Sequence, residues 1–169
     1  MELPKRKNTR LQDYDYSSNG AYFITVCTHN RRNLFGEIVV GAIHESPEMQ
    51  HNEFGLIAVR QIAMLSERFP ETKIDAFCVM PNHIHMIVVL GNERAIRESP
   101  LRRSVISQMI GYLKAGITKN IRQINVQMTV WQRGYHDYII RNEADYRRIW
   151  QYIDENTAKW TEDKYYYDD

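Results

Sequence analysis

The stretch that decides the fold reads Met80-Pro81-Asn82-His83-Ile84-His85-Met86-Ile87-Val88-Val89-Leu90. It predicts a Pro-Asn turn that leads directly into a strand, whose side chains alternate between the two faces of a sheet. Both faces are apolar beyond the histidines, which is typical of a central strand covered on both sides. One face carries Ile84, Met86, Val88 and Leu90, and the other carries His83, His85, Ile87 and Val89.

The composition is that of an ordinary globular domain. The chain has 169 residues, of which 43% are hydrophobic and 25% charged, so we expect one folded domain over 1–169 with a sizeable core. No apolar stretch follows the first residues, and the longest apolar run, 86–90, is too short to cross a membrane. Cys27 and Cys78 form no Cys-x-x-Cys pair, and we expect reduced thiols in a cytoplasmic, nucleoid-associated protein.

Hydrophobic periodicity predicts the remaining elements. Residues 1–19 form a basic arm before a strand over 21–28, and 34–40 are expected to be an outlying strand, half of a hairpin through Gly41. Asn52 is a candidate N-cap for a helix that ends before Pro70, and Ser104 is one for a helix ending near Asn120. Further strands are predicted over 73–80 and 126–134, and a last helix over 143–162. The order β-α-β-β-α-β predicts an α+β, ferredoxin-like (RRM-like) fold, an antiparallel sheet with two helices on one face and an extra C-terminal helix.

His83 and His85 are the first candidates for chemistry. Two imidazoles on one face at the start of a rigid strand point to the same place, where they can hold a metal ion or a phosphate. The alternative is a pair of core histidines whose nitrogens are satisfied by backbone carbonyls. His136 and Asp137 form a second pair, for which we expect a turn stabilised by side-chain hydrogen bonds.

Tyr152 does not fit the apolar stripe of the last predicted helix. It lies about 100° from Ile153 around the helix, and Asn156 follows one turn later on the same face. A nucleophile beside a neutral oxygen ligand would be useful near two histidines, although a lone tyrosine on a polar surface is also common. Nothing in the sequence places the tail 165–167 near the histidines.

Positive charge is concentrated in two segments of a nearly neutral chain. Residues 94–141 hold nine Lys or Arg against two acidic residues, and residues 1–36 hold six against three. This distribution suits a polyanion such as nucleic acid, and it also suits ordinary solvated faces. The candidate phosphate contacts are Arg6, Arg10, Arg97, Arg102, Arg103, Lys114 and Arg133.

Several motifs in order resemble the REP-associated tyrosine transposases, single-tyrosine members of the HUH (His, bulky hydrophobic, His) endonuclease superfamily. They cover nearly the whole chain. The matching segments are Tyr14-Asp15-Tyr16, Gly20-Ala21-Tyr22-Phe23-Ile24-Thr25, Val79-Met80-Pro81-Asn82-His83-Ile84-His85, Trp131-Gln132-Arg133-Gly134-Tyr135-His136-Asp137, Ile140-Arg141-Asn142, Asp145-Tyr146, Tyr152-Ile153 and Asn156.

The resemblance implies a metal-dependent transposase that cleaves and rejoins single-stranded or hairpin DNA through a 5′-phosphotyrosine on Tyr152. By motif, His83, His85 and Asn156 would ligate Mg²⁺ or Mn²⁺. Thr157 departs from the family, which often has Pro there, and we expect the helix to continue past Asn156. A phenol titrates near pH 10 in the reference state, so the metal or a base must help to activate it. Related transposases often form homodimers, which makes a homodimer a further possibility.

Two other functions fit the same predicted fold. A non-catalytic module would bind single strands on exposed sheet aromatics, for which Tyr22 and Phe23 are candidates. A metal nuclease that uses water would need the histidines but not Tyr152. An inactive relative of the transposases is a third possibility, because the sequence alone does not establish activity.

Overall fold

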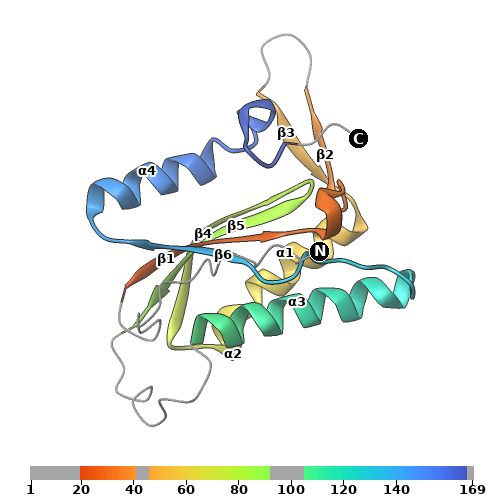
Figure 1. The fold of residues 1–169 in the computed structure, drawn as a ribbon, viewed down its shortest axis with the longest axis horizontal. Helices are drawn as coiled ribbons and strands as arrows, with labels where there is room; N and C mark the ends of the chain where they lie inside the picture. Colours follow the sequence, from red (N-terminus) through yellow and green to blue (C-terminus); the bar gives the residue numbers. More distant parts are fainter. Residues whose placement is uncertain (1–19, 41–45, 92–104, 167–169) are drawn as a thin grey trace, which may run out of the picture.

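The computed structural model describes residues 20–40, 46–91 and 105–166. Its centre is a four-stranded sheet in the order β4-β5-β1-β6, in which every neighbouring pair is antiparallel (Figure 1). The architecture is therefore mixed α+β with an antiparallel sheet, as expected. The strands are β1 (Ala21–Cys27), β4 (Thr72–Met80), β5 (His83–Leu90) and β6 (His136–Ile140).

Strand β5 is central and buried, as the alternation of its side chains predicts. It lies between β4 and β1, which satisfy its backbone on both sides. Ile84, Met86 and Val88 belong to the main core, whereas Ile87 belongs to a smaller core on the other face of the sheet. The Pro81-Asn82 turn joins β4 to β5, with Met80 opposite His83 in the register. His83 and His85 therefore lie at the start of a strand that is paired with a neighbour on each side.

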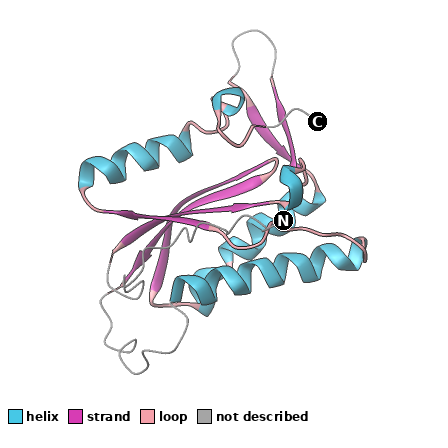
Figure 2. Ribbon diagram, viewed as in Figure 1, coloured by secondary structure: helices cyan, strands magenta, loops and turns pink. Residues whose placement is uncertain are grey.

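Helices cover both faces of the sheet. Helices α1 (Glu53–Ala63) and α3 (Val105–Ile124) lie on one face, where the short helix α2 (Leu65–Arg68) also packs (Figures 1 and 2). Helix α4 (Glu143–Asp154) lies on the other face. Asn52 caps α1 as predicted, because its Oδ1 accepts hydrogen bonds from the Phe54 and Gly55 amides at 3.0 Å. Within the described residues, no helix combines the length and the apolar character needed to cross a membrane.

A small hairpin stands apart from the main sheet. It pairs β2 (Gly36–Val39) with β3 (Glu48–His51), which confirms the outlying strand expected over 34–40. Gly36 has φ +138°, and a Cβ added there would lie 2.1 Å from the Gln50 carbonyl oxygen, so the pairing requires glycine. Gly41 lies outside the described residues. Two 3₁₀ turns, His29–Arg31 and Trp160–Glu162, complete the elements of the described residues.

The strand predicted over 126–134 is wrong, and so is the turn predicted at His136-Asp137. Val126 is 72% exposed, and the segment forms no strand of the sheet: it meets the end of β1 through an isolated bridge from Trp131 to Thr28 and a hydrogen bond from the Gln132 amide to the Cys27 carbonyl at 3.0 Å. The Trp131 indole donates to the Lys114 carbonyl at 3.0 Å, which also ties this segment to α3. Gly134 then turns the chain with φ +79°, and β6 begins at His136.

The last helix is shorter than the predicted 143–162. It ends at Asp154, and the chain continues through turns to the 3₁₀ turn at Trp160–Glu162. Asn and Thr at 156 and 157 are poor helix formers. Asn156 and Trp160 are both buried in the turns that follow the helix. The absence of Pro at 157 therefore does not extend the helix past Asn156.

Candidate active site

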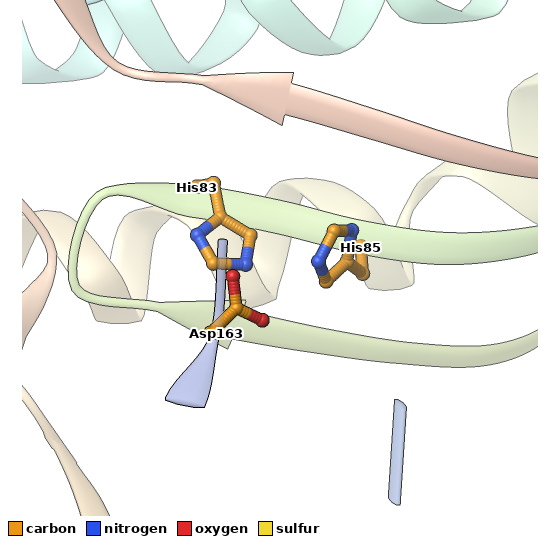
Figure 3. Close-up of side chains that lie close together, drawn as sticks. All are labelled: His83, His85 and Asp163. Atoms are coloured by element: carbon orange, nitrogen blue, oxygen red, sulfur yellow. The ribbon is translucent and has the colours of Figure 1, made fainter. Parts of the chain in front are cut away.

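His83 and His85 lie side by side on β5 (Figure 3), on the face of the strand from which Ile87 packs against α4. Both side chains are fully buried, and their ring centroids are 4.3 Å apart. Because the two residues are separated by one strand position, the alternation of the strand alone puts them on the same face.

Hydrogen bonds fix the orientation of both imidazoles. The amide nitrogen of Asn82 donates to the carbonyls of Tyr165 and Arg31 at 2.8 and 3.2 Å, which leaves its Oδ1 to accept from His83 Nδ1 at 2.9 Å. His83 Nε2 then carries the lone pair, and no described residue hydrogen-bonds to it. His85 Nδ1 lies 2.8 Å from the Thr25 hydroxyl. Second contacts of this kind select the tautomer that binds a metal.

Burial keeps both imidazoles neutral. Desolvation lowers the pKa of His83 to about 4, although the charge of Asp163 acts in the opposite direction. Desolvation also lowers the pKa of His85 well below its ordinary value, and the neighbouring His83 adds to this effect. Only the neutral ring offers a nitrogen lone pair, so the site holds its histidines in the form that ligates metals.

Tyr152 projects from α4 to the same point. Its hydroxyl donates to Asp163 Oδ2 at 2.6 Å and lies 3.3 Å from His85 Nε2. The half-buried ring also meets Phe23 edge to face, with centroids 6.0 Å apart. Burial and the bond to the Asp163 carboxylate both raise the pKa of Tyr152, so the phenol is fully protonated here at neutral pH.

Asn156 reaches the site from the turn after α4, not from the helix. It is buried, and its Nδ2 donates to Asp163 Oδ2 at 2.7 Å. Its Oδ1 is buried without a hydrogen-bond partner among the described residues, as is His83 Nε2. A buried polar atom without a partner is costly, and these two belong to residues expected to be ligands.

Asp163 is a site residue that the sequence reasoning missed. One ligand atom each from His83, His85 and Asp163 lies within 4.8 Å of the others, and this buried group could hold a metal ion (Figure 3). Asp163 Oδ1 accepts from the Tyr165 amide at 2.7 Å, so the carboxylate is held from both sides. No spacing rule points to this residue, because it comes back to the histidines only after the chain turns away from α4.

Tyr165 is a second residue that the sequence did not place. Its buried ring lies 4.8 Å from His83 and 5.5 Å from His85, measured between centroids. The guanidinium carbon of Arg31 and the Nζ of Lys164 lie 5.4 and 4.8 Å from the same ring. The segment from Trp160 to Tyr166 therefore covers the histidines from the side opposite the main core.

The predicted phosphate contacts do not gather at this site in the described part of the chain. Lys114, on α3, donates to the carbonyls of Gln132 and Gly134 at 2.7 and 2.8 Å, on the other face of the sheet. Arg133 is exposed next to Gly134. The remaining candidates, Arg6, Arg10, Arg97, Arg102 and Arg103, lie outside the described residues.

Comparisons place the chain among known proteins. It is 35% identical over 175 residues to an uncharacterized protein of Haemophilus influenzae, covering 96% of this chain and 94% of that protein. It is 26% identical over 158 residues to a protein of the same organism named "Putative REP-associated tyrosine transposase", covering 86% and 74%. No family model matches the chain.

A solved structure shares the fold of this chain. The structure of a REP-associated tyrosine transposase bound to a REP hairpin superposes with a TM-score of 0.61 at 23% identity, covering 89% of this chain and 73% of that one. At this identity the match establishes the fold. The chain therefore belongs to one family with the 35% identical Haemophilus protein, and its resemblance to the REP-associated tyrosine transposases is confirmed.

Proposed function

We propose that this protein is a metal-dependent transposase that cleaves and rejoins single-stranded DNA through Tyr152. The observation that carries the proposal is the position of the Tyr152 hydroxyl, 3.3 Å from His85 Nε2 and hydrogen-bonded to Asp163. A nucleophile, a base and two neutral imidazoles thus converge on one point. The strand order β4-β5-β1-β6 supports a ferredoxin-like arrangement with the tyrosine on the added helix.

The residues present suit a divalent metal. His83 Nε2 and Asn156 Oδ1 are buried polar atoms without a partner among the described residues, and a cation would satisfy both. We assign His83, His85 and Asn156 as ligands of Mg²⁺ or Mn²⁺, with the Asp163 carboxylate as the alternative third ligand. When bound, such an ion polarises the scissile phosphate and stabilises the charge that develops there.

Tyr152 would act as the nucleophile, with Asp163 as its base. The Tyr152 oxygen attacks the phosphorus, and the bond from phosphorus to the 3′-oxygen of the leaving strand breaks. The products are a 5′-phosphotyrosine and a strand that ends in a 3′-hydroxyl. Asp163 accepts the phenol proton along the existing 2.6 Å hydrogen bond, and the 3′-oxygen takes up a proton from water. The covalent bond conserves the phosphodiester energy, so the reverse step rejoins DNA without ATP.

A hairpin-flanked repeat is the substrate we propose. The solved relative described above is bound to a REP hairpin. The basic segments of this chain would contact the phosphates of such a hairpin, and binding would weaken as salt rises. A homodimer, in which one chain supplies Tyr152 to the histidines of its partner, would also be compatible with this chemistry. In the present structure Tyr152 reaches the histidines of its own chain.

The environment of Tyr22 and Phe23 disfavours the non-catalytic module for which they were the candidates. Tyr22 is fully buried in the main core, and Phe23 packs against both His85 and Tyr152. The pair therefore does not form the open stacking surface that an RRM-type module uses.

The deciding experiment is an adduct assay on the full chain with labelled single-stranded hairpin DNA and Mn²⁺, separated on a denaturing gel. We expect an adduct with the wild type and with Tyr112→Phe, an exposed tyrosine on the opposite face. Tyr152→Phe and His85→Ala should form none. Cleavage that survives in Tyr152→Phe would identify water as the nucleophile, and the proposed mechanism would then be wrong.

A further inference from the structure

A pocket of about 450 Å³ opens beside the proposed active site, within the size range of ligand pockets. Its floor is the α4-facing side of strands β1 and β6. Phe23 lies opposite Tyr138 in this pair, and Thr25 lies opposite His136. Arg31, Lys164 and Tyr165 form the wall on the side of the C-terminal segment, and Asp137 also contributes to the lining.

The pocket is continuous with the site through residues that they share. The hydroxyl of Thr25 lies 2.8 Å from His85 Nδ1. The ring of Phe23 lies 4.9 Å from that of His85 and 6.0 Å from that of Tyr152, measured between centroids. Tyr165 packs over His83 as well as lining the pocket. A group bound in the pocket would therefore adjoin the atom attacked by Tyr152.

Two positively charged side chains line the pocket. Arg31 and Lys164 are exposed, and each lies over the Tyr165 ring, with Arg31 also donating to the Lys164 carbonyl at 3.3 Å. Within the described part of the chain, neither forms an ion pair with a carboxylate. They are available to neutralise a phosphate group.

An aromatic ring completes the pocket. Tyr138 sits in the middle of β6 and is 46% exposed, with the half-buried Phe23 opposite it. Unpaired bases stack on such rings irrespective of their sequence, because every base offers a π face. Aromatic and cationic side chains around one cavity are the combination that single-stranded nucleic acids require.

We propose that this pocket binds one unpaired nucleotide adjoining the phosphate that Tyr152 attacks. Its base stacks on Tyr138, and its phosphate lies between Arg31 and Lys164. The inference rests on the proposed function for the position of the scissile phosphate. The binding of a single strand in the pocket can nevertheless be measured without any cleavage.

The probe is fluorescein-labelled dT₁₂, titrated with the full chain in EDTA and followed by fluorescence anisotropy. Tyr138→Ala should weaken binding about tenfold, the range for loss of one stacked base, whereas Tyr138→Phe should bind like the wild type. Tyr112→Ala, an exposed tyrosine on α3, is the matched control and should have no effect. Lys164→Gln and Arg31→Gln should weaken binding, and each should reduce the salt slope by about 0.7. Circular dichroism establishes that each variant is folded.

The outcomes separate the pocket from the proposed chemistry. Two results would overturn the proposal that the pocket binds a nucleotide. One is wild-type protein that does not bind dT₁₂, and the other is folded Tyr138→Ala and Lys164→Gln variants that bind it as tightly as the wild type. An adduct in the gel assay together with that result would leave the tyrosine mechanism standing. Conversely, binding of dT₁₂ that depends on Tyr138, without any adduct, would support the pocket and argue against the tyrosine mechanism.

Discussion

Acidification should destabilise the metal-free protein through its buried histidines. Burial lowers the pKa of His83 from 6.5 to about 4, so between these values the unfolded chain binds a proton that the folded chain excludes. Stability rises with pH wherever the unfolded state binds more protons. The contribution of the neutral His83 to the free energy of unfolding is therefore complete above pH 6.5, and it is lost as pH falls toward 4.

The size of the effect follows from the shift. One pKa unit corresponds to 1.36 kcal/mol, so His83 alone should cost about 2.5 kcal/mol of unfolding free energy between about pH 8 and about pH 4.5. His85 shifts in the same direction and adds to the loss. A loss of this size is large against a typical domain stability of about 5–15 kcal/mol.

Urea unfolding in EDTA at several pH values measures this loss directly. The variant His83→Gln removes the titrating ring and should flatten the profile by about 2.5 kcal/mol relative to wild type. Parallel profiles for wild type and His83→Gln would refute the inference that His83 is held neutral by burial.

Two further predictions concern the oxygen ligands and the base. Asp163→Asn should slow adduct formation about 10²-fold or more and move the remaining activity to higher pH, because the amide cannot accept the phenol proton. The gel assay measures this against Asp154→Asn, an exposed control at the end of α4, and an unchanged rate would exclude Asp163 as the base. Asn156→Ala should weaken Mn²⁺ binding about tenfold or more in calorimetry, whereas Asn120→Ala on α3 should not. Unchanged affinity in Asn156→Ala with a loss in Asp163→Ala would instead assign the third ligand position to Asp163.

Local periodicity was sufficient for the elements that form the core. The apolar residues on both faces of β5 predict its central position, and the alternation of its side chains puts both histidines on one face. Periodicity failed for the strand that precedes α4. It predicted this strand over 126–134, around Trp131, whereas the Trp131 indole bonds to α3 and the strand begins at His136. Short apolar segments such as 126–134 are decided by tertiary contacts, which a periodicity argument does not contain.

The same distinction applies to the site. His83 and His85 lie together because one strand period separates them, and Tyr152 could be singled out because it departs from the stripe of its helix. Asn156 lies near Tyr152, since both donate to Asp163 Oδ2, but it does so from the turn after α4 and not from the next turn of the helix. Asp163 and Tyr165 reach the histidine site through turns that follow α4, and no periodic pattern in the sequence predicts how these turns direct the chain.

The chemistry of a tyrosine mechanism nevertheless calls for a residue such as Asp163. A phenol is a poor nucleophile at neutral pH, so a tyrosine mechanism requires a metal or a base beside the hydroxyl. Burial makes this requirement stricter here, because it raises the pKa of Tyr152 further above that of a free tyrosine. In the proposed mechanism, the Asp163 carboxylate, which accepts the Tyr152 hydroxyl hydrogen bond at 2.6 Å, would take that proton as the attack begins. The spacing of residues could single out His83, His85 and Tyr152, because these lie on a regular strand and a regular helix. The need for a base predicts only the type of residue, and the irregular segment after α4 supplies it as Asp163.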